Sequence, residues 1–203
     1  MVNHVVMQFV AELKDYSPCM WRRFQIGSNV KLEKFCYTLM GLFRMSGGHL
    51  FEFNMRGCRY ALPMVDADGW DEPAKSMSVV INKLFTRKGS SGELWYDFGD
   101  SWYVRVKLEK LVVEEVISPR ELPRVLAGEG YGIVEDCGGV WGLAEIAKGL
   151  QTGQAEDWED QKPWLEENYP EVLERGLEYF DIDEMNSGLN PKGRSDIYKL
   201  MSK

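Results

Sequence analysis

Tyr96-Asp97-Phe98-Gly99-Asp100-Ser101-Trp102 joins two segments in which apolar and polar residues alternate, and this stretch decides the fold. Alternation with a period of two is typical of β-strands, so the two segments predict the arms of a hairpin. A glycine in the first position of a two-residue loop favours a type II′ turn, here at Gly99-Asp100. This register places Asp97 opposite Trp102, on the hairpin face that is otherwise apolar and is expected to face the core.

The Asp97 carboxylate is expected to need a partner, because burying a charge is costly unless hydrogen bonds or an opposite charge compensate it. His49 is the candidate, since it begins another segment whose alternate residues are apolar, from Phe51 to Met55. We therefore expect Asp97 to lie near His49 or to accept backbone N–H groups at the turn. Both residues are candidate catalytic residues, and a purely structural role for both is the alternative.

A second acidic segment, Glu135-Asp136-Cys137-Gly138-Gly139, supplies further candidates. Carboxylates such as those of Asp97, Asp100 and Asp136 are the oxygen ligands that Mg²⁺ and Mn²⁺ accept, so these three are the candidate metal ligands. Such a site requires the acidic segment to fold onto the hairpin tip, and its glycines would permit a close approach. In the alternative interpretation the segment only forms a tight turn, and its acids cap the next helix at Val140.

The full set of candidate catalytic residues contains acids, one histidine and one cysteine: Asp97, Asp100, His49, Glu135, Asp136 and Cys137. His49 could serve as a general base. Cys137 could serve as a nucleophile only if a histidine or a helix N-terminus lowered the pKa of its thiol. No cofactor is expected, and a metal is expected only if the acids converge.

The remaining pattern predicts further strands and helices. Strands are expected where apolar residues alternate, over residues 3–13, 21–26 and 49–55. Apolar residues spaced three and four apart predict amphipathic helices over residues 31–45 and 75–88, with a short helix near 141–150 and a charged helical segment over 155–185. A glycine-rich loop is expected from Gly128 to Gly139.

The composition is that of an acidic globular protein, and 203 residues suit one domain with a helical tail. The net charge of −8 disfavours binding to phosphate backbones, although six basic residues could form a local patch: Arg22, Arg23, Arg56, Arg59, Arg87 and Lys88. The four cysteines lack zinc-type spacing, so reduced thiols in the cytoplasm fit best. No signal peptide is expected, and no apolar run approaches the roughly 20 residues of a membrane span.

These segments together resemble the plasmid pRiA4b open-reading-frame-three-like family, some of whose members are called TnpR-like passenger proteins of insertion elements. The resemblance covers about residues 3–190 and rests on four segments in order: Trp21-Arg22-Arg23-Phe24, His49-Leu50-Phe51-Glu52-Phe53, the hairpin stretch with Leu108-Glu109, and the acidic segment. It implies an α+β fold in which a mixed or antiparallel sheet forms a roll or partial barrel packed with helices. We accordingly expect the family domain over residues 1–153 and an acidic helical extension, residues 154–203, packed on the same domain.

The chain departs from the family pattern at several polar positions. Val104 stands where members often have a histidine, and residues 131–134 replace a segment with a cysteine and two prolines. Phe35-Cys36 and Arg44-Met45 stand where members usually have a histidine and a tryptophan. If relatives use those residues for metal binding or catalysis, this protein has lost that capacity.

Three functions follow as hypotheses. The first, which we favour, is a non-enzymatic protein-interaction or accessory module linked to mobile elements, which predicts an aromatic patch for an unknown protein partner and no convergent acid cluster. The candidate binding residues are aromatic: Trp95, Trp102, Tyr96, Tyr103 and Trp141. The second is a divalent-metal-dependent hydrolase built on the acids. The third is a nucleic-acid-binding accessory protein, which the net charge disfavours.

Overall fold

The computed structural model describes residues 5–63, 73–112, 118 and 121–189, and it shows an α+β fold. The strands are β1 Val6–Leu13, β2 Trp21–Gly27, β3 Phe51–Met55, β4 Cys58–Ala61, β5 Lys75–Ser76, β6 Ser91–Tyr96, β7 Trp102–Val112 and β8 Arg124–Glu129. The helices are α1 Leu32–Leu42, α2 Ile81–Leu84, α3 Gly139–Thr152, α4 Trp158–Asn168, α5 Pro170–Arg175 and α6 Ile182–Leu189. The predicted fold class is therefore confirmed.

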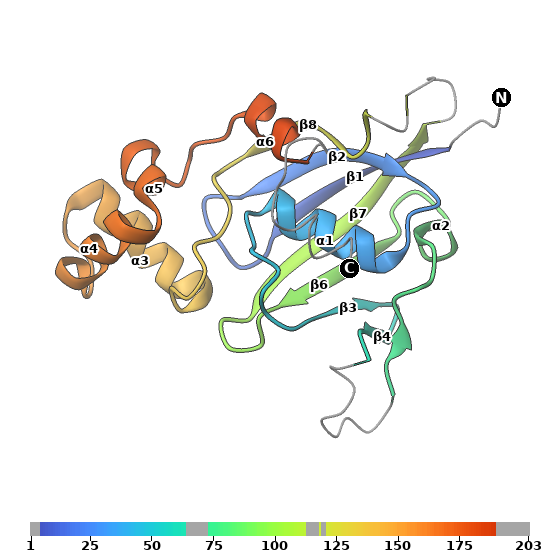
Figure 1. Ribbon diagram of the computed structural model, residues 1–203, viewed down its shortest axis with the longest axis horizontal. Coiled ribbons are helices and arrows are strands. Elements are labelled where there is room, and N and C mark those ends of the chain that lie inside the picture. The colour runs from blue at the N-terminus through green and yellow to red at the C-terminus, as the bar shows by residue number, and fades with distance from the viewer. Residues whose placement is uncertain (1–4, 64–72, 113–117, 119–120, 190–203) are drawn as a thin grey trace.

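One mixed sheet organises the described residues. Its strand order is β5-β4-β3-β6-β7-β1-β2-β8, and neighbouring strands run antiparallel except for β4 and β5, which are parallel. The sheet does not close on itself: in the described chain, β5 and β8 form its two edges. The expected roll or partial barrel is thus an open sheet, with α1 lying across one face (Figure 1).

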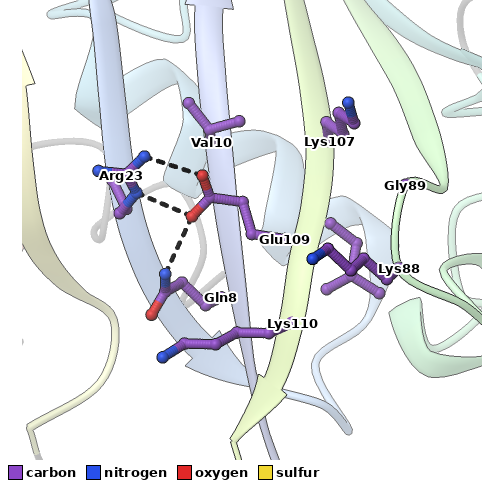
Figure 2. A pocket seen from close by; sticks show the side chains of 9 residues that line it. Gln8, Val10, Arg23, Lys88, Gly89, Lys107, Glu109 and Lys110 are labelled. Carbon is purple, nitrogen blue, oxygen red and sulfur yellow. Dashed lines mark hydrogen bonds and ion pairs between the residues drawn. The ribbon is translucent and has the colours of Figure 1, made fainter.

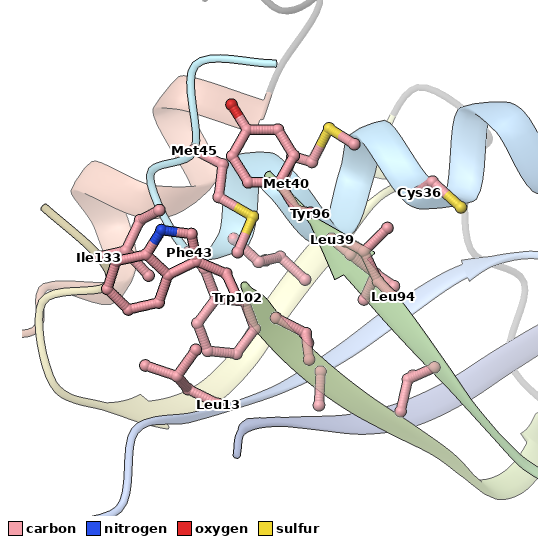
Figure 3. Close-up of a cluster of buried hydrophobic side chains, with 14 of the residues drawn as sticks. Leu13, Cys36, Leu39, Met40, Phe43, Met45, Leu94, Tyr96, Trp102 and Ile133 are labelled. Atoms are coloured by element: carbon pink, nitrogen blue, oxygen red, sulfur yellow. The ribbon is translucent and has the colours of Figure 1, made fainter. Parts of the chain in front are cut away.

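The core lies between that face and α1. The alternating β1 residues Met7, Phe9 and Ala11 are fully buried, as their period of two predicts. Figure 3 shows part of this core, where Leu39 of α1 lies among hairpin side chains that include Trp102. Hydrophobic burial of this extent supplies the main driving force for folding the domain.

The predicted hairpin forms, but its predicted register is wrong by one residue. Tyr96 pairs with Trp102 and Trp95 with Tyr103, so residues 97–101 form a loop in place of the two-residue turn. A shift of one residue moves side chains to the opposite face of a strand. The longer loop lets Tyr96 and Trp102 both face the core, and both are fully buried. The two-residue turn would have placed them on opposite faces.

The predicted helix over residues 75–88 is wrong apart from one turn. Only Ile81–Leu84 is helical, and Lys75–Ser76 forms β5. The backbone between them forms a turn that the start of α1 holds in place, where the Leu32 N–H donates to the Val79 carbonyl at 2.8 Å. The apolar residues that suggested the helix are nevertheless buried: Met77, Ile81, Leu84 and Phe85.

Strand β8 is absent from the predictions because Gly128 suggested a loop. In the structure Gly128 pairs with Arg22 of β2. A Cβ at this position would lie 2.8 Å from the Trp21 carbonyl oxygen and 2.9 Å from the Phe180 ring. The glycine therefore lets β8 lie close to both β2 and the chain that follows α5.

A fully buried arginine lies on the core side of β2. Nε of Arg22 donates to the Leu42 carbonyl at 3.0 Å. Its two terminal nitrogens donate to four further backbone carbonyls, those of Trp21, Glu129, Gly130 and Tyr131. The guanidinium carbon lies 4.6 Å from the centre of the Phe180 ring. Burial, with a contribution from nearby Arg44, lowers the pKa of Arg22 to about 9. Arg22 thus ties the end of α1 to the chain that follows β8.

Helices α3 to α6 follow β8, and their apolar side chains join the same core. The first three lie beyond the hairpin end of the sheet, whereas α6 lies beside β8 (Figure 1). Asn186 of α6 bonds the edge of β8: the Val125 N–H donates to Asn186 Oδ1 at 2.7 Å, and the Asn186 amide donates to the Val125 carbonyl at 3.1 Å. No helix of the described chain combines the length and apolarity needed to cross a membrane.

Candidate functional site

Three separate segments meet at the hairpin tip. The loop after β6 brings Asp97, the segment before β3 brings His49, and the loop before α3 brings Asp136. His49 Nδ1 lies 3.6 Å from Asp97 Oδ2, and His49 Nε2 lies 3.8 Å from Asp136 Oδ1. The predicted proximity of Asp97 and His49 is confirmed. The acidic segment also folds onto the hairpin tip, which is the condition set for a metal site.

The local backbone fixes the orientation of Asp97. The residue has φ 55°, in the left-handed region that aspartate tolerates better than most residues. Its N–H donates to the Leu50 carbonyl at 2.9 Å, and its Oδ1 accepts the Gly99 N–H at 3.0 Å. One carboxylate oxygen therefore caps the turn while the other faces His49, so both of the predicted partners are present.

The His49 ring presents one nitrogen to each aspartate. It stands edge-on to Tyr96, with ring centres 5.7 Å apart and an interplanar angle of 89°. A neutral imidazole carries one N–H and one lone pair. When Nδ1 carries the proton toward Asp97, Nε2 offers its lone pair on the side of Asp136. A carboxylate that fixes the tautomer in this way is typical of metal-binding and basic histidines.

Glycines allow the acidic segment to approach the hairpin tip. A Cβ on Gly139 would lie 2.3 Å from the Asp100 carbonyl oxygen, well inside van der Waals contact. The Gly138 N–H donates to the Asp100 carboxylate at 3.3 Å. Asp100 therefore holds the two loops together, and it is not one of the three residues whose side chains converge. The close approach predicted for these glycines is confirmed.

Glu135 supports the acidic segment from inside the protein. Its Oε1 accepts the Tyr96 hydroxyl at 2.5 Å and the Ser46 N–H at 2.8 Å. Its backbone N–H donates to the Tyr169 hydroxyl oxygen at 3.1 Å. Burial and the hydrogen bond to Glu135 raise the pKa of the Tyr96 hydroxyl. This candidate catalytic acid is thus engaged in fixing the loop that carries Asp136.

Cys137 lacks the features of a nucleophile. Burial, together with the negative charge of Asp100, raises the pKa of its thiol to about 12. The thiol lies 3.5 Å from the Gly139 carbonyl oxygen, to which it can donate a weak hydrogen bond. A reactive cysteine requires a lowered pKa, so the predicted possibility that the helix N-terminus activates Cys137 is wrong.

The converging side chains have the dimensions of a metal site. One potential ligand atom from each of His49, Asp97 and Asp136 lies within 4.8 Å of the others. Two atoms bound to one ion can lie no farther apart than twice the metal–ligand bond, roughly 4.0–5.2 Å for bonds of about 2.0–2.6 Å. One imidazole and two carboxylates suit zinc, manganese or iron. The Asp136 side chain is 73% exposed, which leaves one side of the cluster open to solvent.

The candidate binding aromatics divide into buried and exposed groups. Tyr96 and Trp102 are fully buried in the core and present no surface. Trp95 and Tyr103 are partly exposed on the opposite face of the sheet, where their rings stack with centres 5.5 Å apart. Trp141, in the first turn of α3, is 83% exposed. Only the last three could contact a partner directly.

Comparisons with known proteins assign the chain to a family. A family model described as "Plasmid pRiA4b ORF-3-like protein" matches residues 5–187. The chain belongs to the plasmid pRiA4b ORF-3-like family. It is similar to "Uncharacterized protein y4hQ" of Sinorhizobium fredii (strain NBRC 101917 / NGR234), with 28% identity over 146 residues, which cover 71% of this chain and 73% of that protein. It is also similar to the crystal structure of "Protein of Unknown Function MM3350" from Methanosarcina mazei Go1, with a TM-score of 0.73, 28% identity and coverage of 90% of this chain and 97% of the other.

The resemblance to the pRiA4b ORF-3-like family is therefore confirmed, and His49, Asp97 and Asp136 all come from the segments that carry it. Sequence reasoning did not find the residues that support the site, such as Ser46 and Tyr169. These residues contact Glu135 through a backbone N–H and a tyrosine hydroxyl. No spacing rule marks such long-range contacts in a sequence.

The buried tyrosines of this pRiA4b ORF-3-like protein predict a loss of stability at alkaline pH. Burial raises the pKa of Tyr16 to about 12, and the pKa values of Tyr96 and Tyr131 are also raised. A group whose folded pKa exceeds its unfolded pKa stabilises the protein below the unfolded value of 10.0 and ceases to do so as pH rises through the folded value. Arg22 acts oppositely, because its folded pKa is lowered, but it is one group against three.

We therefore expect the urea midpoint of unfolding to fall as pH rises from about 10 to about 12. Tyr131→Phe keeps the buried ring and removes one titrating hydroxyl, so its midpoint should fall less steeply over the same range. A midpoint that is flat above pH 10 in the unsubstituted protein would contradict the argument.

Proposed function

We propose that this protein is a divalent-metal-dependent hydrolase whose ion binds at His49, Asp97 and Asp136. The observation that supports it is the convergence of these three side chains, from three separate segments, within 4.8 Å at a partly open surface. The interaction-module hypothesis predicts no convergent acid cluster, so this geometry favours the hydrolase over it. The ligand set of nitrogen and oxygen favours Zn²⁺ or Mn²⁺ as the ion.

The residues would divide the chemistry between them. Nε2 of His49 and the Asp136 carboxylate would hold the ion, which lowers the pKa of a bound water and polarises a substrate oxygen. Asp97 would keep Nδ1 of His49 protonated and the ring oriented, or would supply its Oδ2 as a third ligand. The exposed side of Asp136 would admit the substrate. The Glu135 hydrogen bonds would hold the loop in place as substrate enters and leaves.

The first test measures metal binding. We expect Zn²⁺ or Mn²⁺ to bind at one site per chain by isothermal titration calorimetry and to raise the melting temperature by mass action. Asp136→Asn should weaken the ion's affinity roughly 100-fold, by analogy with losses at metal sites, while leaving the metal-free melting temperature unchanged, since this side chain is mostly exposed. Asp160→Asn, an exposed acid on α4, is the matched control and should bind the ion as the unsubstituted protein does.

The second part of the test separates binding from catalysis. Metal-loaded protein should hydrolyse at least one member of a panel of activated esters, amides and phosphoesters, and Asp136→Asn should lose that activity. Equal metal affinity of Asp136→Asn and Asp160→Asn would show that the ion does not bind at the proposed site. Metal binding that depends on Asp136, without hydrolysis of any substrate, would support the metal site and contradict the hydrolase activity.

A second candidate function is the protein-interaction or accessory module, which is favoured by Trp141. A tryptophan that is 83% exposed on a described helix is a typical anchor for a protein partner. An accessory role in mobile elements, expected from the family resemblance, would use this surface. Trp141→Ala should abolish capture of a partner from the native host while leaving metal affinity unchanged, and capture equal to that of the unsubstituted protein would exclude Trp141 as its anchor.

A further inference from the structure

An open groove of about 660 Å³ lies on the sheet face opposite α1. It crosses β2, β1 and β7 and is bounded by the segment that precedes β6 (Figure 2). Its charged residues are four cations and one carboxylate: Arg23, Lys88, Lys107, Lys110 and Glu109. The groove is therefore cationic, although the whole chain carries a net charge of −8.

The carboxylate in the groove is already neutralised. Arg23 binds Glu109 through two nitrogens, at 2.8 and 2.9 Å, and the Gln8 side-chain amide donates to the same carboxylate at 2.9 Å. These hydrogen bonds, together with the Arg23 charge, hold the pKa of Glu109 below its ordinary value. Glu109 is thus fixed as an anion paired with Arg23, and it forms no ion pair with the lysines.

The three lysines are exposed and available. In the part of the chain that the structure describes, no carboxylate lies within ion-pair distance of Lys88, Lys107 or Lys110. Two of them come from β7, on either side of Glu109, and the third comes from the segment before β6. Like charges gathered without counter-charges repel one another, and a bound polyanion would relieve that repulsion.

Aromatic rings lie on the same face of the sheet. Tyr103 occupies an outward position on β7, four residues before Lys107, and stacks on Trp95 of β6. Trp21 lies on β2, where the Arg23 guanidinium stands 5.4 Å from its ring centre. The face therefore combines exposed cations with flat aromatic side chains, and both sets of rings lie toward the hairpin end of the groove.

We propose that this face binds single-stranded nucleic acid, with the lysines contacting phosphates and the aromatic rings stacking on bases. A cationic groove beside aromatic platforms is the chemistry by which proteins hold single strands without reading their sequence. An acidic peptide would match the charge but would gain nothing from the rings. The open sheet face, with its exposed rings, suits an exposed strand of bases better than a duplex, whose bases are stacked inside.

The basic patch in the structure contains only some of the residues predicted from the sequence. Arg22 is buried in the core and bonded to carbonyls, so it cannot contact a phosphate. Of the six residues named from the sequence, Arg23 and Lys88 line the groove. Lys107 alternates with core residues on β7 and so projects from the opposite face. A β-bulge between β1 and β7 brings Lys110, which pairs with Gln8, to the same face.

The test is fluorescence anisotropy with labelled single strands of about 12 nucleotides, one of thymidine and one of uridine, a length within the usual site size. The buffer contains EDTA, so the result does not depend on the proposed metal site. We expect the unsubstituted protein to bind with a slope of log affinity against log salt of about −2 to −3, as three or four phosphate contacts require. A duplex of the same length should compete more weakly than the single strand.

Two variants assign the binding to this face. Lys88→Gln, Lys107→Gln and Lys110→Gln together should weaken binding at least tenfold and flatten the salt slope. The control changes three exposed lysines elsewhere, Lys34, Lys148 and Lys162, to glutamine, and it should bind as the unsubstituted protein does even though its net charge is the same as that of the groove variant. Tyr103→Leu keeps an apolar residue and should weaken binding at least fivefold without altering the salt slope.

Three outcomes would overturn the proposal. They are no binding at about 50 mM salt, equal loss in the groove variant and the control variant, and equal or stronger competition by duplex or by polyglutamate.

Discussion

Arg22→Met should lower the free energy of unfolding by about 3–5 kcal/mol. Methionine fills much of the same volume but donates no hydrogen bond. The five backbone carbonyls that Arg22 now serves would lose their donor, and each buried acceptor left unpaired costs about 1–3 kcal/mol. Relief from burying the charge offsets part of that sum.

Arg23 is the matched control for this substitution. It is the next residue on the same strand, but it faces the groove, is partly exposed and pairs with Glu109. Because exposed ion pairs are worth little, Arg23→Met should cost about 1 kcal/mol or less. Urea unfolding followed by circular dichroism measures both. Losses of similar size in the two variants would show that the buried carbonyl bonds of Arg22 carry no special weight.

Gly139→Ala should separate the acidic segment from the hairpin tip. The added Cβ would lie 2.3 Å from a backbone oxygen, that of Asp100, so the backbone of one of the two loops must move. Gly139 also has φ 70°, which alanine adopts at a cost of roughly 1 kcal/mol. We expect a loss of stability of about 2–4 kcal/mol and, in any metal titration, an affinity reduced at least tenfold, since Asp136 moves with its loop.

Gly138→Ala is the matched control, because it adds the backbone strain without the clash. Gly138 also has a positive φ, 89°, but a Cβ placed there has no atom within 4 Å. It should therefore lose only the cost of the strained backbone and keep its metal affinity. If both variants lose the same stability and bind metal equally, the contact between Gly139 and Asp100 does not position the site.

The fold could be predicted wherever burial repeats with a clear period. The alternation in β1 and the three-and-four spacing in α1 both follow from one face packing on a core. The same reasoning failed between residues 75 and 88, where apolar residues are buried but only one helical turn forms, because hydrogen bonds with the start of α1 hold the preceding backbone in a turn. A local pattern reports which residues are buried, and it does not report which backbone partner a segment will find.

The site was predicted in part through an incorrect register. The sequence predicts Asp97 on the core face through a two-residue turn, and that turn does not form. Its proximity to His49 holds for another reason: the left-handed backbone at Asp97 and the bond from its N–H to Leu50 bring the carboxylate back toward the start of β3. The part that could not be predicted is the set of contacts between distant segments, such as Glu135 with Tyr96.

The Asn186 side chain has a consequence for how molecules of this protein meet one another. β8 is an edge of the sheet, and unpaired edge strands are ready templates for pairing with a strand from another chain. At Val125 the asparagine amide occupies both the N–H and the carbonyl, as a neighbouring strand would. Helix α6 therefore closes this edge to sheet extension, and the protein can keep a wide, open sheet without offering β8 as a starting point for aggregation.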